Sequence, residues 1–429
     1  MSTSFRSITG TFDVLPDPYR IDDALIAGSA AWRFVEQTVR DVMARYGAEE
    51  IRTPILEPTE LIARGIGQLT DIVSKEMFAF ERGDTNYVLR PEVTAPVMRA
   101  YLQHRLDQRG GVQRLYYIGP CFRAERPQRG RYRQFHQFGV ELIGAEAPQA
   151  DAEVIAMMWS VYRALGVTDV KLRINTLGDA ESRPRYKEAL QAYLSPHEER
   201  LTETSRQRLA TNPLRILDTK DRGERALLEG APKLIDFVDD ASRRHYETVK
   251  ALLDQQGIPF VEDAFLVRGL DYYTRTSFEL ESPALGAQSA LAGGGRYDLL
   301  ALEVGSKEPV PAVGFAAGLE RLFLALDAAG VELPGSPRPE VYLVALGEEA
   351  AAWAAGEAAT LRARGISVVT DLLTRSMKAQ MREANRLNAR MTVIVGSDEL
   401  AAREAVVRDM SDSSQVRVAF DDLAAHLAG

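Results

Sequence analysis

Five arginines and one acid fall within eleven consecutive positions of this sequence: Arg123, Glu125, Arg126, Arg129, Arg131 and Arg133. Runs with the composition of β-strands flank them at 115–122 and 134–144. A strand–loop–strand hairpin of this kind presents permanently charged guanidinium forks, which suit polyanionic ligands such as a nucleoside triphosphate or a nucleic acid. A solvated charged hairpin is the alternative. Polar residues continue into the second strand, which favours a ligand site.

A second polar stretch, LVRGLDYYTRTSFELES (266–282), places charged and phenolic side chains within eight residues: Arg268, Asp271, Tyr272, Tyr273 and Arg275. As strand core these side chains would need hydrogen-bond partners, so a pocket lining explains them better. The run AGGGRYDLL (292–300) follows. Its three glycines would let a ligand approach the backbone closely, although a tight turn is the alternative.

Two shorter segments hold candidate binding groups. In LRPEVTAPVMRAY (89–101), Glu92 and Thr94 alternate onto one face before a helix expected near Pro96. A carboxylate and a hydroxyl there would receive a substrate ammonium, and helix capping is the alternative. AVGFAAGLERL (312–322) predicts a strand that runs into a helix. An arginine at that junction would grip a phosphate tail, whereas simple packing with a surface arginine is the alternative.

A basic helix is predicted near 375–389. Its cations recur every three or four residues and would share one face: Arg375, Lys378, Arg382, Arg386 and Arg390. Like charges on one face repel, so a phosphate backbone is the natural partner, and a solvated face remains the alternative.

The chain of 429 residues is too long for one core. Short strand-like runs separated by turns predict an α+β fold with a mostly antiparallel sheet flanked by helices. Strands are expected at 87–89, 115–122, 134–144, 170–176, 264–268, 276–281 and 289–292, and a helix at 21–46. We expect a first domain at 1–330 that contains a helical insertion at 179–258. A proline-rich linker (331–338) then leads to a small α/β domain at 339–429.

Composition bounds the function. With 45% hydrophobic and 26% charged residues the chain is typical of a soluble globular protein, and no apolar run approaches membrane-spanning length. No secretory signal is recognisable, so a cytoplasmic location is expected. The single cysteine and five scattered histidines predict no disulfide and no zinc site. Because the net charge is −9, any polyanion must meet local basic patches.

Together these segments resemble the class II aminoacyl-tRNA synthetases, specifically the histidyl-tRNA synthetase family. The stretch FRAERPQRGRYRQFHQ resembles the family's motif 2, and AVGFAAGLERL its motif 3. RGLDYYTR and AGGGRYD are similar to its two histidine-specific signatures, and IRTPILEP after Gly47 to motif 1. SITGTFDVLP, LRPEVTAP and NPLRILDTK also match family patterns. The resemblance covers nearly the whole chain, and it implies a class II catalytic domain with a C-terminal anticodon-binding domain.

The resemblance implies that the chain is a histidine–tRNA ligase, which forms histidyl-adenylate from L-histidine and ATP with Mg²⁺. The histidyl group then passes to tRNA(His), and AMP and pyrophosphate are released. A homodimer is implied by class membership, and no zinc, haem or flavin is expected. Two alternatives remain: a synthetase-like regulatory subunit of histidine biosynthesis, which lacks the C-terminal domain, and a pure RNA-binding module.

Residue roles follow from the resemblance alone. Arg123 and Arg268 would be catalytic. Histidine would be bound by Glu92, Thr94, Arg123, Gln137, Glu141, Arg268, Tyr272, Tyr273 and Tyr297. ATP would be bound by Arg123, Glu125, Arg131 and Arg321. The tRNA would be contacted by Arg126 and Gln128 at the loop tip and by Arg375, Lys378, Arg382 and Arg386 in the C-terminal domain. No protein ligand for a metal ion is assigned. Ala124, Arg129, Thr274 and Ala292 depart from common family residues, but none of them removes a charged group that the chemistry needs.

Overall fold

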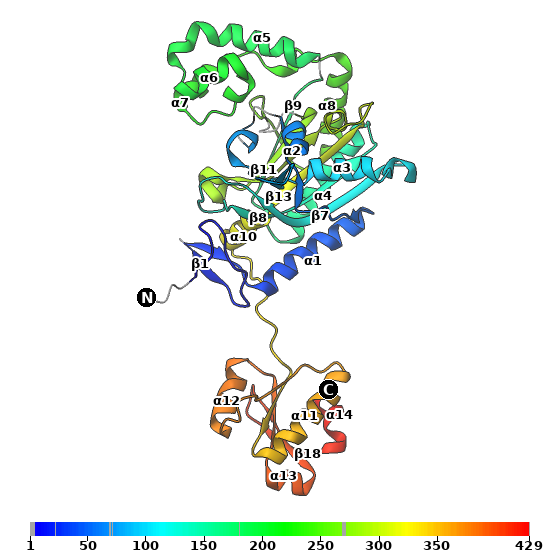
Figure 1. Cartoon of the computed structure of the whole chain (residues 1–429), viewed down its shortest axis with the longest axis vertical. Coiled ribbons are helices and arrows are strands. Elements are labelled where there is room, and N and C mark those ends of the chain that lie inside the picture. The colour runs from blue at the N-terminus through cyan, green and yellow to red at the C-terminus, as the bar shows by residue number, and fades with distance from the viewer. Residues whose placement is uncertain are drawn as a thin grey trace. The chain divides into compact units, whose positions relative to one another are not determined.

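The computed structural model describes residues 5–21, 23–67, 70, 72–179, 181–267 and 272–428. The chain forms two compact units, Met1–Pro334 and Gly335–Gly429 (Figure 1). Among the described helices, none is both long and apolar enough to cross a membrane.

An eight-stranded sheet organises the first unit, in the order β10-β9-β11-β12-β13-β8-β7-β3. The strands are β3 (Glu49–Glu50), β7 (Gln113–Phe122), β8 (Gln134–Ile143), β9 (Lys171–Thr176), β10 (Val261–Glu262), β11 (Thr274–Glu281), β12 (Ala290–Arg296) and β13 (Ala312–Gly318). Neighbouring strands run antiparallel except for the two edge pairs, β10–β9 and β3–β7. The predicted α+β class with an antiparallel-rich sheet is confirmed.

Strand alternation separates two faces of this sheet. On β8, Phe138, Val140 and Leu142 enter the main hydrophobic core, whereas Gln137 and Glu141 point to the opposite face. Four helices contribute to that core: α1 (Ser29–Arg45), α4 (Pro148–Ala164), α8 (Asp240–Gln255) and α10 (Leu319–Ala328). The opposite face packs against a second cluster that includes α3 (Thr94–Gln103) and α9 (Leu300–Glu303).

Smaller elements complete the first unit. A three-stranded sheet of order β4-β6-β5 contains β4 (Leu56–Pro58), β5 (Phe78–Arg82) and β6 (Thr85–Leu89). Between β4 and β5 the chain forms α2 (Thr59–Ile66) and a π-helical turn at Ile72–Glu76. The region expected to be an insertion contains α5 (Ser182–Leu194), α6 (Glu203–Thr211) and α7 (Arg222–Leu228), which share a core of their own. Helix α8 instead packs into the main core.

Two local predictions are wrong. The helix expected at 21–46 begins only at Ser29, because the preceding residues pair as the hairpin β1 (Tyr19–Ile21) and β2 (Ala24–Ile26). Gly28 precedes the helix, where an added Cβ would lie 2.5 Å from the carbonyl oxygen of Pro16. No strand forms at 264–267: this part is a turn closed by a bond from the Leu266 N–H to the Asp263 carbonyl, 3.0 Å long.

The second unit is a small α/β domain, as predicted. Its five-stranded sheet, ordered β15-β14-β16-β17-β18, is parallel over its first three strands and antiparallel beyond them. The strands are β14 (Val341–Ala345), β15 (Val368–Thr370), β16 (Met391–Val395), β17 (Glu404–Asp409) and β18 (Gln415–Ala419). The helices are α11 (Glu348–Ala363), α12 (Met377–Arg386), α13 (Ser397–Ala402) and α14 (Leu423–Ala428).

Candidate active site

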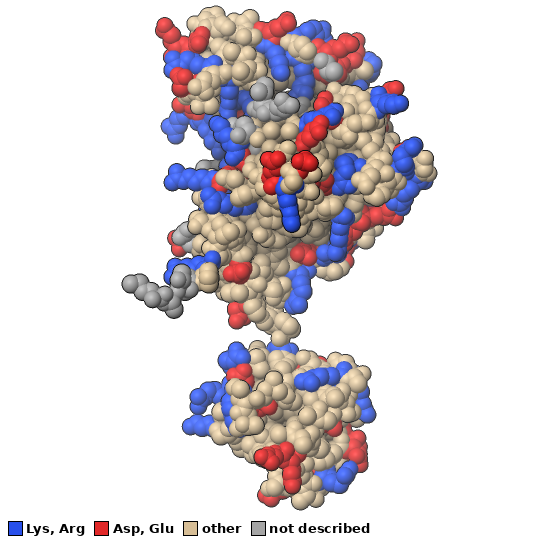
Figure 2. Space-filling view, viewed as in Figure 1, with Lys and Arg blue, Asp and Glu red and all other residues tan. Residues whose placement is uncertain are grey.

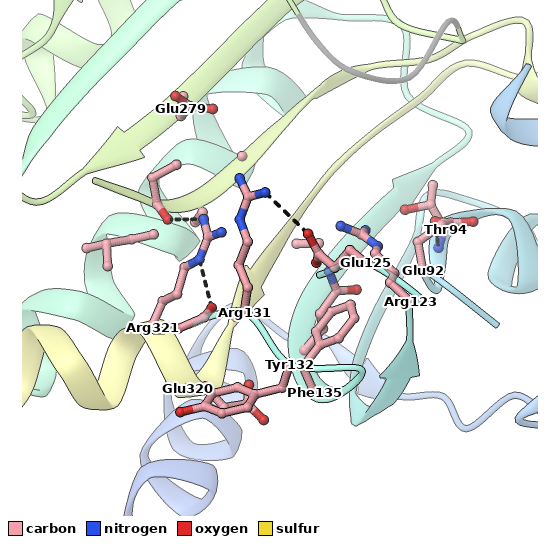
Figure 3. Close-up of a pocket in the computed structure, with 18 of the residues that line it drawn as sticks. Glu92, Thr94, Arg123, Glu125, Arg131, Tyr132, Phe135, Glu279, Glu320 and Arg321 are labelled. Atoms are coloured by element: carbon pink, nitrogen blue, oxygen red, sulfur yellow. Dashed lines mark hydrogen bonds and ion pairs between the residues drawn. The ribbon is translucent and has the colours of Figure 1, made fainter. Parts of the chain in front are cut away.

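A cavity of about 240 Å³ opens on the face of the large sheet that the main core does not cover. Its walls come from the β7–β8 hairpin, β11, β12, β13 and the first turn of α10 (Figure 3). Most of the residues predicted to bind histidine or ATP line it: Glu92, Thr94, Arg123, Glu125, Arg131, Gln137, Tyr272, Tyr273 and Arg321. Segments far apart in the sequence therefore meet in one site. Arg268 lies outside the described residues.

Two arginines form one end of the cavity. Arg131 and Arg321 both donate to the Oε1 atom of Gln288, over 3.1 and 3.4 Å. Arg321 also donates to the carbonyl of Ala290 at 2.8 Å, and Arg131 pairs with Glu125 at 3.2 Å. Burial, followed by the nearby charge of Arg131, lowers the pKa of Arg321. Two like charges held side by side are suited to an anion carrying more than one negative charge.

Arg123 lies between that end of the cavity and Glu92 and Thr94, as Figure 3 shows. Its Nε atom donates to the carbonyl of Pro91 over 3.1 Å, and its guanidinium lies 5.1 Å from the centre of the Phe135 ring. These contacts fix the plane of the guanidinium and leave its other nitrogens toward the cavity. An arginine so held can bridge a phosphate and a carboxylate.

Glu141 does not itself line the cavity. It is a buried carboxylate that contacts Thr94, which does. It accepts hydrogen bonds from the hydroxyls of Thr94 at 2.8 Å, Tyr117 at 3.3 Å and Tyr297. Burial raises the pKa of Glu141 to about 8, against the lowering effect of these donors. A carboxyl group that titrates near neutral pH is suited to hydrogen-bond a ring nitrogen such as that of imidazole.

Glycines make room for this cluster. A Cβ added to Gly314 on β13 would lie 1.8 Å from the Oε2 atom of Glu141, and one on Gly139 would lie 2.4 Å from the Tyr117 hydroxyl. On β12, a Cβ added to Gly295 would lie 2.9 Å from the ring of Tyr273. At Gly139 and Gly295 the backbone of the neighbouring strand lies closer still, so the sheet and the pocket's side chains together exclude a Cβ there.

The remaining predicted pocket residues surround the carboxylate. Tyr297 packs edge-on against Tyr272 and Tyr273, with ring centres 5.6 and 6.4 Å apart. Glu92 accepts the N–H groups of Thr94 and Ala95 at 2.6 and 3.0 Å, so it caps α3 as the alternative interpretation held, while it also lines the cavity. Burial raises the pKa of the Glu92 carboxyl.

Sequence reasoning missed several residues of the site. Tyr117 donates to Glu141, Gln288 holds both Arg131 and Arg321, and Glu320 accepts the backbone N–H of His136 at 2.9 Å. Tyr117 lies two positions from Leu115 and four from Cys121, which share its buried face, so strand phase was its only signal. Gln288 lies in an irregular turn and gave no signal.

The residues predicted to contact tRNA fall in two places. Arg126 and Gln128 are exposed at the hairpin tip, where Gln128 and Arg131 pair through their backbones. In the second unit, Lys378, Arg382 and Arg386 are exposed on α12, and Lys and Arg side chains gather there in Figure 2.

The basic helix predicted at 375–389 is shorter than expected, so its five cations do not share one helical face. Arg375 precedes α12 and pairs with Asp371 at 2.6 Å. Arg390 follows the helix and donates to the carbonyl of Leu427 at 2.6 Å. Arg386 pairs with Glu383 at 2.6 Å.

An antiparallel sheet with an arginine-lined hairpin and a strand–helix junction around one cavity defines the catalytic domain of a class II aminoacyl-tRNA synthetase. The family model for histidyl-tRNA synthetase matches residues 20–322, and that for an anticodon binding domain matches 340–428. The histidine–tRNA ligase of Chloroherpeton thalassium is 48% identical, over 98% of this chain and 96% of the relative. That of Prosthecochloris aestuarii is 47% identical, over 99% of both.

Solved structures agree with these matches. The crystal structure of apo S. aureus histidyl-tRNA synthetase is similar with a TM-score of 0.82 and 37% identity, over 99% of this chain and 100% of that one. The chain belongs to the histidyl-tRNA synthetase family. The expected function, that of a histidine–tRNA ligase, is confirmed.

Proposed function

We propose that the cavity activates L-histidine with ATP, and that the arginine-lined end holds the triphosphate while the Glu141 end holds the imidazole. The observation that carries this proposal is that Arg123 and Arg321, remote in sequence, line one cavity with Glu92 and Thr94. The histidine carboxylate is the nucleophile. It forms a bond to the α-phosphorus of ATP, and the bond to the bridging oxygen breaks to release pyrophosphate.

The side chains supply charge and alignment rather than a nucleophile. Arg123 would neutralise both the α-phosphate and the attacking carboxylate, since its guanidinium is fixed from behind by Pro91 and Phe135. Arg131 and Arg321 would hold the outer phosphates. Glu92, Thr94 and Gln137 would receive the α-amino group. Tyr272, Tyr273 and Tyr297 would shape the ring pocket around Glu141.

Magnesium would enter with ATP as part of the substrate. Mg²⁺ commonly takes one or two protein carboxylates and otherwise phosphate and water oxygens. Glu125 and Glu279 both line the cavity that holds the arginines, so oxygen ligands are present. The ion would offset phosphate charge, and the protein side chains would orient the triphosphate around it.

Transfer to tRNA(His) forms the second step, in which a ribose hydroxyl of the terminal adenosine displaces AMP from histidyl-adenylate. Arg126 and Gln128 would meet the acceptor end, and the basic residues of the C-terminal unit, Arg375, Lys378, Arg382 and Arg386, would contact the tRNA backbone. We further propose a cytoplasmic homodimer. Phe34 on α1 and Ile55 and Leu56 near β4 are exposed apolar residues that a second copy would cover.

Histidine-dependent ATP–pyrophosphate exchange, run with each of the twenty amino acids, tests the proposal. Exchange should occur with histidine alone. The Arg321→Met variant should lose about 10²-fold in rate, by analogy with the loss of one group that stabilises developing charge. The exposed linker residue offers a matched control, Arg338→Met, which should keep the wild-type rate. Equal rates in the two variants would remove Arg321 from the ATP site. Arg268→Ala should also lose at least about 10²-fold.

A further inference from the structure

The loop of the β7–β8 hairpin forms few backbone hydrogen bonds within itself. Between the end of β7 at Phe122 and the start of β8 at Gln134, the loop carries five arginines and one acid, so like charges repel within it. Its internal backbone contacts are the pair of bonds between Gln128 and Arg131, 3.1 and 2.8 Å long, and one bond from the Arg123 N–H to the Arg133 carbonyl at the base. The same loop must still hold Glu125, Arg131 and Tyr132 at the cavity wall.

A short segment near the N-terminus contacts this loop from outside the cavity. Residues 9–12, here called the N-terminal strap, lie over Pro127 and Arg133. The carbonyl of Gly10 accepts the backbone N–H of Arg133 at 2.7 Å, and the carbonyl of Thr9 accepts its Nη1 at 3.2 Å. The β1–β2 hairpin that follows the strap packs against α10 (Figure 1).

The contact passes directly to a site residue. Arg133, held by the strap, accepts the backbone N–H of Arg123 through its own carbonyl at 2.9 Å. On the other side of the loop, the N–H of Ala124 donates to the carbonyl of Glu76 at 2.7 Å. The base of the loop is therefore held between two segments remote from it in the sequence.

An aromatic contact joins the strap to the cavity wall. The ring of Phe12 meets Tyr132 edge-on, with centres 4.8 Å apart, and lies 6.4 Å from Trp32 in the main core. Tyr132 itself lines the cavity. A residue of the loop is thereby connected to the rigid core through Phe12 rather than through the hairpin alone.

Gly10 makes this approach possible. Its φ is +87°, and the N–H and Oγ1 of Thr11 both donate to the carbonyl of Ile8, which closes a turn. A turn of this kind needs a positive φ at its third position. A Cβ there would lie 2.7 Å from the Cγ of Pro127 and 3.0 Å from the Cγ of Arg133.

We propose that the N-terminal strap positions the motif 2 hairpin for ATP, so that Gly10 and Phe12 are positioning residues for adenylate formation. The inference rests on the proposed function of the cavity. It assigns to residues 9–12 an effect on the ATP end of the site and on Arg123, and none on the imidazole pocket, because the hydrogen-bond donors of Glu141 are Thr94, Tyr117 and Tyr297, which belong to neither the strap nor the loop.

The test compares two glycine variants in histidine-dependent ATP–pyrophosphate exchange. In Gly10→Ala, the added Cβ displaces the loop, and kcat/KM for ATP should fall about 10-fold or more, whereas the preference for histidine over other amino acids, which the imidazole pocket sets, should keep its wild-type value. Gly257→Ala is the matched control: its φ is +66°, yet nothing lies within 4 Å of an added Cβ. It carries similar backbone strain without a collision, so its ATP kinetics should not change.

A second variant and a second readout keep the inference testable if Gly10→Ala folds poorly. Phe12→Leu loses the ring contact with Tyr132 and should also raise the KM for ATP. In both variants trypsin should cut faster after Arg129, which is exposed at the loop tip. Unchanged ATP kinetics in Phe12→Leu, or an equal loss in Gly257→Ala, would overturn the inference. Absence of histidine-dependent exchange in the wild-type protein would instead overturn the proposed function.

Discussion

Replacing Tyr297 by phenylalanine tests the interpretation of the buried carboxylate most directly. The hydroxyl of Tyr297 donates to Oε2 of Glu141, a residue only 1% exposed, so water does not replace that bond. Two other donors remain, from Thr94 and Tyr117. The variant keeps the ring and removes only the oxygen, so packing against the neighbouring tyrosines is retained.

The size of the effect follows from the charge on the acceptor. A hydrogen bond to a charged group contributes about 1.5–3 kcal/mol. Because the Tyr297 bond orients the Glu141 carboxylate toward the imidazole, its loss should lower kcat/KM for histidine by about 10- to 150-fold. The Tyr297 bond also lowers the pKa of Glu141, which burial raises to about 8. Its removal should move the pH dependence of the KM for histidine to higher pH.

The assay is histidine-dependent pyrophosphate exchange over a range of pH, with the KM for ATP measured in parallel. Tyr162→Phe is the matched control. Tyr162 is fully buried in the same unit, and its hydroxyl has no hydrogen-bond partner among the described residues. The control should behave as wild type. A KM for histidine and a pH profile in Tyr297→Phe that match this control would refute the role given to Glu141.

Other consequences are open to measurement. Asp151→Asn should destabilise the first unit by up to about 3–5 kcal/mol in denaturant unfolding, because the fully buried Arg296 then keeps only the partly exposed Asp298 as a charge partner; an unchanged midpoint would contradict this. The pKa of Glu141 is raised in the folded state from 4.5 to about 8, so its proton stabilises the fold fully below about pH 4.5 and that contribution is lost as pH rises to about 8. Relative to Glu141→Gln, the wild type should therefore lose unfolding free energy between about pH 4.5 and about pH 8, and a constant difference would disprove the shift. Reversing Lys378 and Arg382 to glutamate should raise the KM for tRNA about 10-fold at low salt and leave pyrophosphate exchange unchanged; loss of both activities would argue for misfolding instead.

Local patterns predicted the parts of the fold that depend on local forces. The strands expected at 115–122 and 134–144 match β7 and β8 to within two residues, because alternation and flanking turns act within each strand. The strand-to-helix junction predicted at 312–322 matches the passage from β13 into α10. The start of α1 was wrong, since Tyr19–Ile21 pairs with the residues that follow it, a choice that composition does not reveal.

The sequence predicted the charged residues of the candidate site but missed two of its neutral residues. Arg123 and Arg321 stand out by charge and by their place beside strand ends. Tyr117 and Gln288 are ordinary residues until the sheet brings them to Glu141 and to the arginines. The prediction of a basic helix at 375–389 was wrong for a related reason. Arg375 forms an ion pair with Asp371 before α12 begins, which spacing alone cannot show.

The glycine at position 314 restricts where this pocket can change during evolution. Any side chain there collides with the Glu141 carboxylate, whose oxygen already occupies the space of a Cβ. Shortening Glu141 would not open the position, because the carbonyl oxygen of Val140 occupies the same space. A lineage that acquires a preference for another amino acid must therefore reshape the pocket at Glu141 itself, while β13 keeps its glycine throughout.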